Sequence, residues 1–282
     1  MDAWEAYFWP NSNVLKNIPG FRTETELRKF EFAATRQRAE QLRENPVQGR
    51  FDSAHFLEIH RRLFVDVYEW AGQFRTVDMA KGGSHFAPVA TKVHTLESWG
   101  EKILGELATE NHLKGLTTGA FVDRLTYHYG EQNHWHPVRE GNGRTTKEFL
   151  SQLAKAAGYE LELDRINAKT WNDAAARQMQ GDGRRVHEIF EKIAIPSRAV
   201  AFRDEHITDA LKRFPELQGA ANALEAAQVK AETSISPTDR RAFLYQVRAT
   251  LLERLHAGEI INAPAVKTPP HEAQQTHEPY RR

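Results

Sequence analysis

The feature that most constrains the fold of this chain is a nine-residue stretch at positions 136–144, which reads HPVREGNGR. The residues before it (121–133) and after it (145–154) both have helical patterns, so residues 136–141 are expected to form a loop between two helices. Glycines let backbone N–H groups turn inward, and the start of a helix adds partial positive charge. Together they predict an anion-binding loop, and the nearby histidine and carboxylate indicate chemistry on a phosphate.

Two common phosphate-binding motifs are excluded by this arrangement. A P-loop requires G-x-x-x-x-G-K-(S/T) directly after a strand, and a dinucleotide-binding fingerprint also follows a strand. In this chain the two glycines are two positions apart and the preceding segment looks helical. The phosphate site is therefore expected in a helix–loop–helix context.

The histidine and the carboxylate have distinct chemical uses. His136 has a side chain that titrates near neutrality, so it can accept a proton from a hydroxyl group. Glu140 can hold Mg²⁺, a hard cation that prefers carboxylate and phosphate oxygens. These two residues predict a general base beside a metal.

The remaining residues of the stretch suit a polyphosphate. Gly141, Asn142 and Gly143 can surround a diphosphate with backbone N–H groups and one side-chain amide. Arg144 can make a bidentate contact to phosphate. Lys147 follows three residues later on the same helical face and can neutralise a farther phosphate. Together they predict an ATP-type nucleotide site.

Helical patterns cover most of the rest of the chain, so the predicted fold class is all-α. Residues 1–22 are expected to form an irregular arm, because prolines and a glycine interrupt them. The one strand signal lies between 74 and 90, where alternating residues flank a glycine turn and predict a small β-hairpin. Helices are predicted over 23–43, 53–68, 91–111, 117–134, 143–157, 163–179, 183–193, 202–231 and 236–256.

These patterns predict a main domain and two smaller parts. The main domain is expected to span residues 1–197, with its core at about 50–195 and the motif at 136–147. A helical appendage is predicted at 198–262. The proline-rich residues 263–282 are expected to be disordered.

Composition excludes several classes of function. Lys and Arg number 38, as do Asp and Glu, so the net charge of zero argues against direct nucleic-acid binding. The chain has no cysteine, which excludes disulfides and thiolate metal sites and favours a cytoplasmic location. No apolar stretch approaches the ~20 residues needed to span a membrane, and the N-terminus does not read as a signal peptide. Export as an effector is the alternative to a cytoplasmic protein.

On these residues the chain resembles the Fic family, whose motif runs H-x-F-x-(D/E)-G-N-G-R-x-x-R across a loop between two helices. Residues 136–147 match this motif, with Val138 in place of the phenylalanine and Lys147 in place of the last arginine. Upstream, the segments IHRRLF at 59–64 and YEWAG at 68–72 are also similar to the family. The resemblance covers about residues 5–195 and implies a Fic-type helical bundle.

The resemblance implies a protein adenylyltransferase (an AMPylator), a nucleotidyltransferase that moves AMP from ATP to a Ser, Thr or Tyr hydroxyl and releases pyrophosphate. His136 would then be the catalytic base and Glu140 the Mg²⁺ ligand. The nucleotide-binding residues would be the anion hole Gly141, Asn142 and Gly143, with Arg144 at the β-phosphate and Lys147 at the γ-phosphate.

In the family, the hairpin at 74–90 corresponds to a flap that aligns the backbone of the target as an added strand. We call this hairpin the flap. The residues that would contact the nucleotide or the target there are Lys81, Gly82, Ser84, His85 and Phe86.

The resemblance also bears on regulation and partners. Many members are silenced by a helix with the pattern (S/T)-x-x-x-E-(G/N), which the chain lacks, because Glu40 and Glu106 stand four residues before Glu44 and Glu110. This implies a toxin–antitoxin pair with a separate small antitoxin, and a type II topoisomerase subunit as a first candidate target. Two alternatives are a Doc-like kinase that uses the γ-phosphate and a catalytically weak interaction module.

Overall fold

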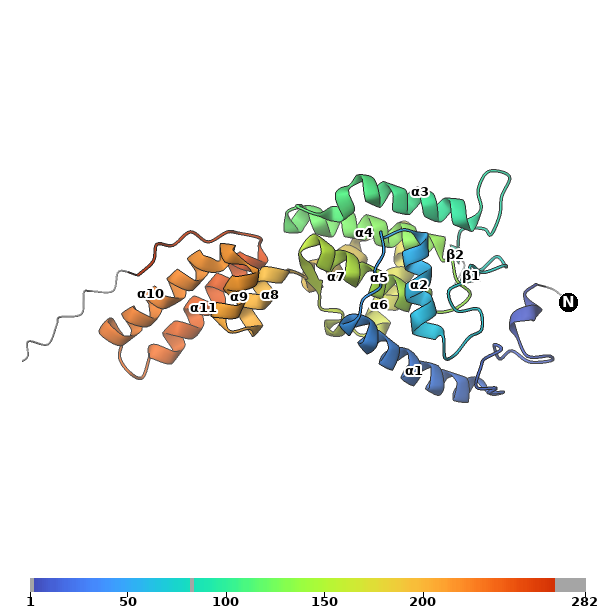
Figure 1. Cartoon of the computed structure of the whole chain (residues 1–282), viewed down its shortest axis with the longest axis horizontal. Coiled ribbons are helices and arrows are strands. Elements are labelled where there is room, and N and C mark those ends of the chain that lie inside the picture. Colours follow the sequence, from blue (N-terminus) through green and yellow to red (C-terminus); the bar gives the residue numbers. More distant parts are fainter. Residues whose placement is uncertain (1–2, 82–83, 267–282) are drawn as a thin grey trace, which may run out of the picture. The chain divides into compact units, whose positions relative to one another are not determined.

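A computed structural model describes residues 3–81 and 84–266. The chain forms two compact units, Met1–Ser197 and Arg198–Arg282 (Figure 1). Helices dominate both units, which confirms the predicted all-α class. No helix in the described ranges is both long enough and apolar enough to cross a membrane.

The first unit consists of helices, short 3-10 turns (η) and two small sheets. Its helices and turns are η1 Glu5–Tyr7, α1 Glu24–Glu44, α2 Ser53–Phe64, α3 Leu96–Thr109, η2 Asn111–Leu113, α4 Thr118–Trp135, α5 Asn142–Ala157, η3 Leu163–Arg165, α6 Ala168–Met179 and α7 Arg184–Ile193. Its strands are β1 Ala80–Lys81, β2 Ser84–His85, β3 Tyr159–Leu161 and β4 Ala194–Pro196.

The core of this unit lies around α2, α4 and α5, with α1 and α3 on opposite sides (Figure 1). Aromatic side chains fill it, and those that are fully buried include Phe56, Phe121, Trp135 and Phe149. The Trp135 indole donates to the Leu96 carbonyl at 2.7 Å and lies against Gly100, where a Cβ would come within 2.3 Å of the ring. Glycine therefore lets α3 approach the end of α4, which leads directly into the 136–144 loop.

Several predicted boundaries were wrong. The helix predicted over about 53–68 ends at Phe64, and turns follow it in which the N–H groups of Val67 and Tyr68 donate to the Phe64 carbonyl. The helix predicted over 91–111 begins only at Leu96, after the Thr95 cap.

The flap is much shorter than the 74–90 hairpin that the sequence predicts. Its strands pair Ala80 with His85 and Lys81 with Ser84. Residues 74–79 are not a strand, since the backbone N–H of Arg75 donates to the Pro137 carbonyl at 2.8 Å instead of to a neighbouring strand. Gly82 lies outside the described residues.

A second sheet was missed. Strands β3 and β4 are three residues each and pair antiparallel, with Tyr159 opposite Pro196. This sheet was not predicted, because three residues carry too little alternation to be recognised and the two strands are far apart in sequence.

The second unit carries α9 Ile207–Arg213, η4 Pro215–Leu217, α10 Gln218–Ser234 and α11 Arg240–His256, with α8 Ser197–Asp204 at its start. The single helix predicted over 202–231 was wrong, because the segment divides into α8, α9 and α10, and Pro215, which has no N–H to continue a helix, stands at the last break. Residues 263–266 have no regular structure, and the rest of the predicted tail lies outside the described residues.

Candidate active site

His136 ends α4 in an unusual backbone conformation. Its φ of 45° and ψ of 57° are left-handed, and its N–H caps the helix on the Gln132 carbonyl at 3.1 Å. The imidazole Nδ1 lies 3.3 Å from the Asn133 carbonyl, which can only accept, so Nδ1 carries the proton. The lone pair is therefore on Nε2, which is the atom that can accept a proton from a substrate.

The surroundings of His136 keep its imidazole neutral. Its ring stacks on Phe86 of the flap, with centroids 3.6 Å apart and planes 13° apart. Burial lowers the pKa of His136 from 6.5 to about 3, and the positive charges of Arg75 and Lys81 also lower it. The hydrogen bond to the Asn133 carbonyl raises the pKa but does not outweigh these effects. A neutral imidazole at physiological pH is the form required of a general base.

Arg75 connects the His136 loop to the base of the flap. Its side chain is fully buried, and Nε donates to the His136 carbonyl at 2.8 Å while Nη1 donates to the Val77 carbonyl at 2.6 Å. Nη2 donates to the carbonyl of Ala87, which follows the second strand of the flap. One guanidinium thus satisfies three buried carbonyls and fixes the flap relative to the histidine.

Asn142 holds the loop closed from within. The Val138 N–H donates to Asn142 Oδ1 at 3.0 Å, and Asn142 Nδ2 donates back to the Val138 carbonyl at 2.6 Å. Val138 itself is completely buried. The sequence suggested that the Asn142 amide faces a phosphate, whereas in the structure both ends of the amide bind the loop.

The two glycines differ in what they allow. Gly141 has a φ of 88°, and a Cβ there would lie 2.2 Å from the Phe64 ring. A Cβ on Gly143 would meet no atom within 4 Å, so open space lies above this residue. Within the described ranges, the N–H groups of Asn142 and Gly143 meet no acceptor, because they stand at the start of α5, where no preceding helical turn offers a carbonyl. We call these two free N–H groups the cradle, and they can bind an anion.

Glu140 lies at the opening of the loop. Its side chain is 45% exposed, Oε1 accepts from the Gly141 N–H at 2.9 Å, and Arg144 Nη2 lies 3.6 Å away. His60 fixes the backbone here: its Nδ1 accepts from the Gly72 N–H at 2.8 Å, so its Nε2 donates to the Glu140 carbonyl at 3.0 Å. One half-exposed carboxylate is a suitable ligand for Mg²⁺, which takes one or two carboxylates and completes its shell with water and phosphate oxygens. The described residues contain no cluster of three His, Cys, Asp or Glu side chains that could hold a metal without a substrate.

Arg144 is held in place by α1. Its Nη2 donates to Glu31 Oε1 at 2.5 Å and its Nη1 donates to Thr35 Oγ1 at 3.2 Å. The guanidinium carbon lies 4.6 Å from the centroid of the Phe64 ring. Sequence reasoning missed these α1 partners, since a Glu and a Thr on a long charged helix carry no motif.

Lys147 lies one turn farther along α5. Its amine is 4.5 Å from the centroid of the Trp171 ring, and burial lowers the pKa of the amine. In the part of the chain that the structure describes it has no carboxylate partner within ion-pair distance. Its positive charge is therefore not neutralised by the protein.

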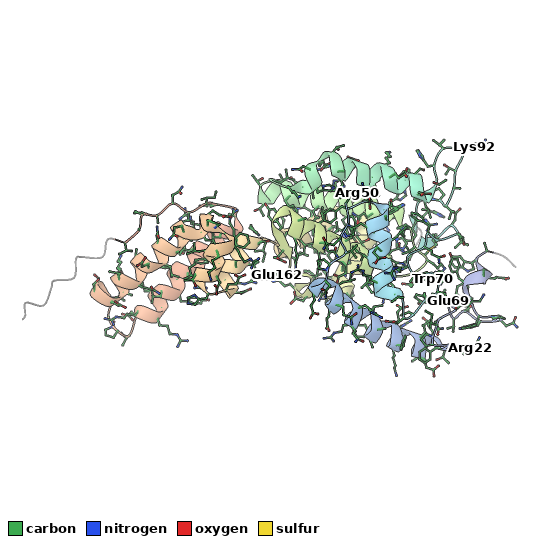
Figure 2. The ribbon with its side chains drawn as sticks, viewed as in Figure 1. Arg22, Arg50, Glu69, Trp70, Lys92 and Glu162 are labelled. Atoms are coloured by element: carbon green, nitrogen blue, oxygen red, sulfur yellow. The ribbon has the colours of Figure 1, made fainter. Side chains whose placement is uncertain are left out.

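The structure brings together most, but not all, of the predicted residues. His136, Glu140, the cradle, Arg144 and Lys147 come from one loop and the start of α5, and Phe86 contacts His136. Lys81 and His85 of the flap are exposed, and among the described residues neither side chain forms a hydrogen bond or ion pair with the loop. Ser84 contributes its backbone to the pairing with Lys81. Trp70, labelled in Figure 2, lies on the segment that follows α2, and its ring stacks on that of Tyr68 with centroids 4.3 Å apart.

Comparison with known proteins places this geometry in a family. A model of the Fic/DOC family matches residues 50–154. The chain is 39% identical over 178 residues to the protein adenylyltransferase VbhT of Bartonella schoenbuchensis, a match that covers 63% of this chain but only 36% of VbhT. It is 33% identical over 190 residues to the probable protein adenylyltransferase Fic of Escherichia coli K12, covering 67% of this chain and 92% of that protein.

Solved structures agree. The BepC protein of Bartonella tribocorum with bound AMPPNP matches with a TM-score of 0.64 and 26% identity, over 68% of this chain and 97% of that one. The N-terminal Fic domain of a putative cell filamentation protein of Bartonella quintana with bound ADP matches with a TM-score of 0.65 and 28% identity. This match covers 68% of this chain and 95% of that one. With its motif on the loop between α4 and α5, this chain belongs to the Fic/DOC family.

Proposed function

We propose that the chain is a protein adenylyltransferase that transfers AMP from ATP to a side-chain hydroxyl of a target protein. The relatives named as adenylyltransferases and the related structures with bound AMPPNP and ADP support a nucleotide as the substrate. The site supplies the parts that this reaction needs, since transfer of this kind depends on positioning and on stabilising negative charge.

The chemical step begins at His136. Its Nε2 takes the proton of the target hydroxyl as the hydroxyl oxygen attacks the α-phosphorus of ATP. The new oxygen–phosphorus bond forms as the bond from the α-phosphorus to the oxygen that bridges to the β-phosphate breaks. Pyrophosphate leaves with the negative charge, and AMP stays on the target.

The cradle and two cations bind the phosphates. The free N–H groups of Asn142 and Gly143 stand at the start of α5, where the helix dipole adds positive charge. Arg144 would hold the β-phosphate and Lys147 the γ-phosphate, and both become part of the leaving pyrophosphate. Glu140 would hold Mg²⁺, which when bound neutralises phosphate charge.

The single observation that carries the choice of AMP transfer is the open space at Gly143. No atom lies within 4 Å of where its Cβ would be, so the β- and γ-phosphates can lie over the start of α5. We expect that arrangement to leave the α-phosphorus on the side of His136, which precedes the cradle in the loop. A lysine at this position, as in Doc-like kinases, would fill the space and favour attack on the γ-phosphate.

Radiolabelled ATP tests the proposal. The protein is incubated with bacterial lysate and either α-³²P-ATP or γ-³²P-ATP, and we expect labelled target only from the α-labelled nucleotide. A His136→Ala variant should transfer no label, while His187→Ala, a surface histidine on α7 that pairs with Asp123, should match the unaltered protein. Label from γ alone would show kinase chemistry, and absence of label from both would contradict enzymatic activity.

The partners follow from the same proposal. The target is a protein with an accessible hydroxyl next to a segment that can align with the flap, and a type II topoisomerase subunit is the first candidate to assay. A separate small antitoxin is the proposed regulator. Co-expression with the neighbouring small reading frames tests it, and unchanged AMP transfer with every one of them would contradict it.

A further inference from the structure

A carboxylate from the N-terminal helix α1 contacts an arginine of the proposed nucleotide site. Glu31 lies in the middle of α1, more than a hundred residues before Arg144, and its side chain is only 14% exposed. Its Oε1 accepts from Arg144 Nη2 at 2.5 Å. A buried carboxylate is costly unless it is paired and hydrogen-bonded, so this contact needs a reason beyond surface charge pairing.

The second oxygen of Glu31 is also occupied. Its Oε2 accepts from the hydroxyl of Tyr68, a ring that is almost fully buried. Burial raises the pKa of Tyr68, and the Glu31 carboxylate adds to that effect, so the phenol keeps its proton and acts as a donor. With one oxygen on Tyr68 and one on Arg144, the carboxylate cannot rotate freely.

The guanidinium of Arg144 is correspondingly restrained from three directions. Glu31 holds Nη2, Thr35 holds Nη1, and the Phe64 ring lies 4.6 Å from the guanidinium carbon. A guanidinium has five N–H donors, of which α1 uses two. Three remain, which is enough for a bidentate contact with a phosphate.

We propose that Glu31 is a positioning residue that orients Arg144 for the β-phosphate of the nucleotide. The inference rests on the proposed function, because that function assigns Arg144 to the β-phosphate. Without Glu31 the long arginine side chain would sample several rotamers, and ordering it would have to be offset by the bound nucleotide. The anchoring by Tyr68 and Thr35 makes Glu31 part of a rigid frame, which favours orientation over competition with the phosphate.

Binding of ADP and of AMP separates this role from a merely structural one. Affinities of both nucleotides are measured with Mg²⁺ by calorimetry for the full chain and for Glu31→Ala, Glu31→Gln and Glu40→Ala. Glu40 is the matched control, because it lies on the same helix in an exposed ion pair with Arg36, away from the site. Only ADP carries the phosphate that Arg144 is expected to hold.

We expect Glu31→Ala to weaken ADP binding by about 10-fold, the order expected when a charge-assisted bidentate contact is lost, and to change AMP binding by less than about 2-fold. Glu31→Gln keeps an acceptor for Arg144 and should recover ADP affinity to within about 3-fold of the unaltered protein. Tyr68→Phe, which keeps the ring but frees one carboxylate oxygen, should weaken ADP binding in the same direction and by less. It serves as the test if Glu31→Ala does not fold.

Three results would overturn the proposal. Equal weakening of ADP and AMP would make Glu31 a structural residue, and unchanged ADP affinity would remove any role. Tighter ADP binding or faster AMP transfer in Glu31→Ala would show that Glu31 competes with the phosphate. The proposed function fails separately: a protein that binds ADP but transfers no label from α-³²P-ATP is not an adenylyltransferase, while the ratio of ADP to AMP affinity still decides the role of Glu31.

Discussion

Replacing Gly141 by alanine should destabilise the first unit strongly. Gly141 has a φ of 88°, and placing an L-residue in the left-handed region costs about 1–2 kcal/mol. The added methyl group would lie 2.2 Å from Cζ and 2.4 Å from Cε2 of Phe64, a ring that is fully buried. Relieving such an overlap in a packed core costs about 1–3 kcal/mol, so the total loss in the free energy of unfolding is about 2–5 kcal/mol.

Gly143→Ala is the matched control. A Cβ there meets nothing within 4 Å, and alanine has a higher helix propensity than glycine, so stability should change by less than about 0.5 kcal/mol or rise slightly. Urea unfolding followed by tryptophan fluorescence measures both variants. It reports on the first unit alone, since all six tryptophans lie in it: Trp4, Trp9, Trp70, Trp99, Trp135 and Trp171.

A double-mutant cycle separates the clash from the backbone strain. In a Phe64→Leu background the smaller side chain leaves room for the methyl group. The loss in the free energy of unfolding caused by Gly141→Ala should therefore be smaller there, by at least about 1 kcal/mol, than in the unaltered chain. The strain from the positive φ remains in both backgrounds. A cost of Gly141→Ala below about 1 kcal/mol in the unaltered chain would refute the reasoning, because neither the φ nor the overlap would then have its usual effect.

Three further predictions concern histidines and the loop. Because the pKa of His136 is lowered to about 3, kcat/KM for AMP transfer should not fall between pH 7 and pH 5 through this group, whereas a histidine with a pKa of 6.5 would lose about 30-fold at pH 5. Burial lowers the pKa of His60 from 6.5 to about 4, so the unfolded chain takes up a proton that the folded chain does not. The stability that comes from this difference in pKa is fully present above pH 6.5 and is lost as the pH falls to 4, a decrease of ~3 kcal/mol in the free energy of unfolding. In His60→Gln the free energy of unfolding measured with urea should depend less on pH across this range. Asn142→Ala removes both hydrogen bonds to Val138 and leaves buried backbone groups unpaired, so the same unfolding assay should show a loss of about 1–3 kcal/mol.

The motif and the fold class could be read from the sequence because both depend on local patterns. Helical spacing on either side of residues 136–141 predicted a loop between two helices, and α4 and α5 flank that loop. A capping residue such as Thr117 or a C-terminal glycine such as Gly158 marks a helix end within a few positions. Signals of this kind need no knowledge of what packs against the segment.

The contacts that fix the site were not predictable in the same way. Glu31 pairs with Arg144 across 113 positions, and Arg75 bonds to His136 across 61. In sequence Glu31 resembles an ordinary charged residue on an amphipathic helix, and nothing in the sequence showed that Arg75 bonds to the His136 carbonyl. Strands β3 and β4 also form only because the ends of α5 and α7 come together, so a pattern confined to either strand could not reveal them.

Helix α2 supports the proposed nucleotide site without supplying a residue to the proposed chemistry. Phe64 packs under Gly141 and lies against the guanidinium of Arg144, and His60 donates to the Glu140 carbonyl. The rings of His60 and Phe64 lie 4.8 Å apart, on one face of α2. That face therefore positions Glu140, the backbone of Gly141 and the Arg144 side chain together. Both α2 and the motif lie within residues 50–154, which match the family model, and the loop packs against these two rings. The 136–141 loop and α2 are therefore best regarded as a single structural element, in which a change to the Phe64 ring alters the geometry of the proposed phosphate-binding residues.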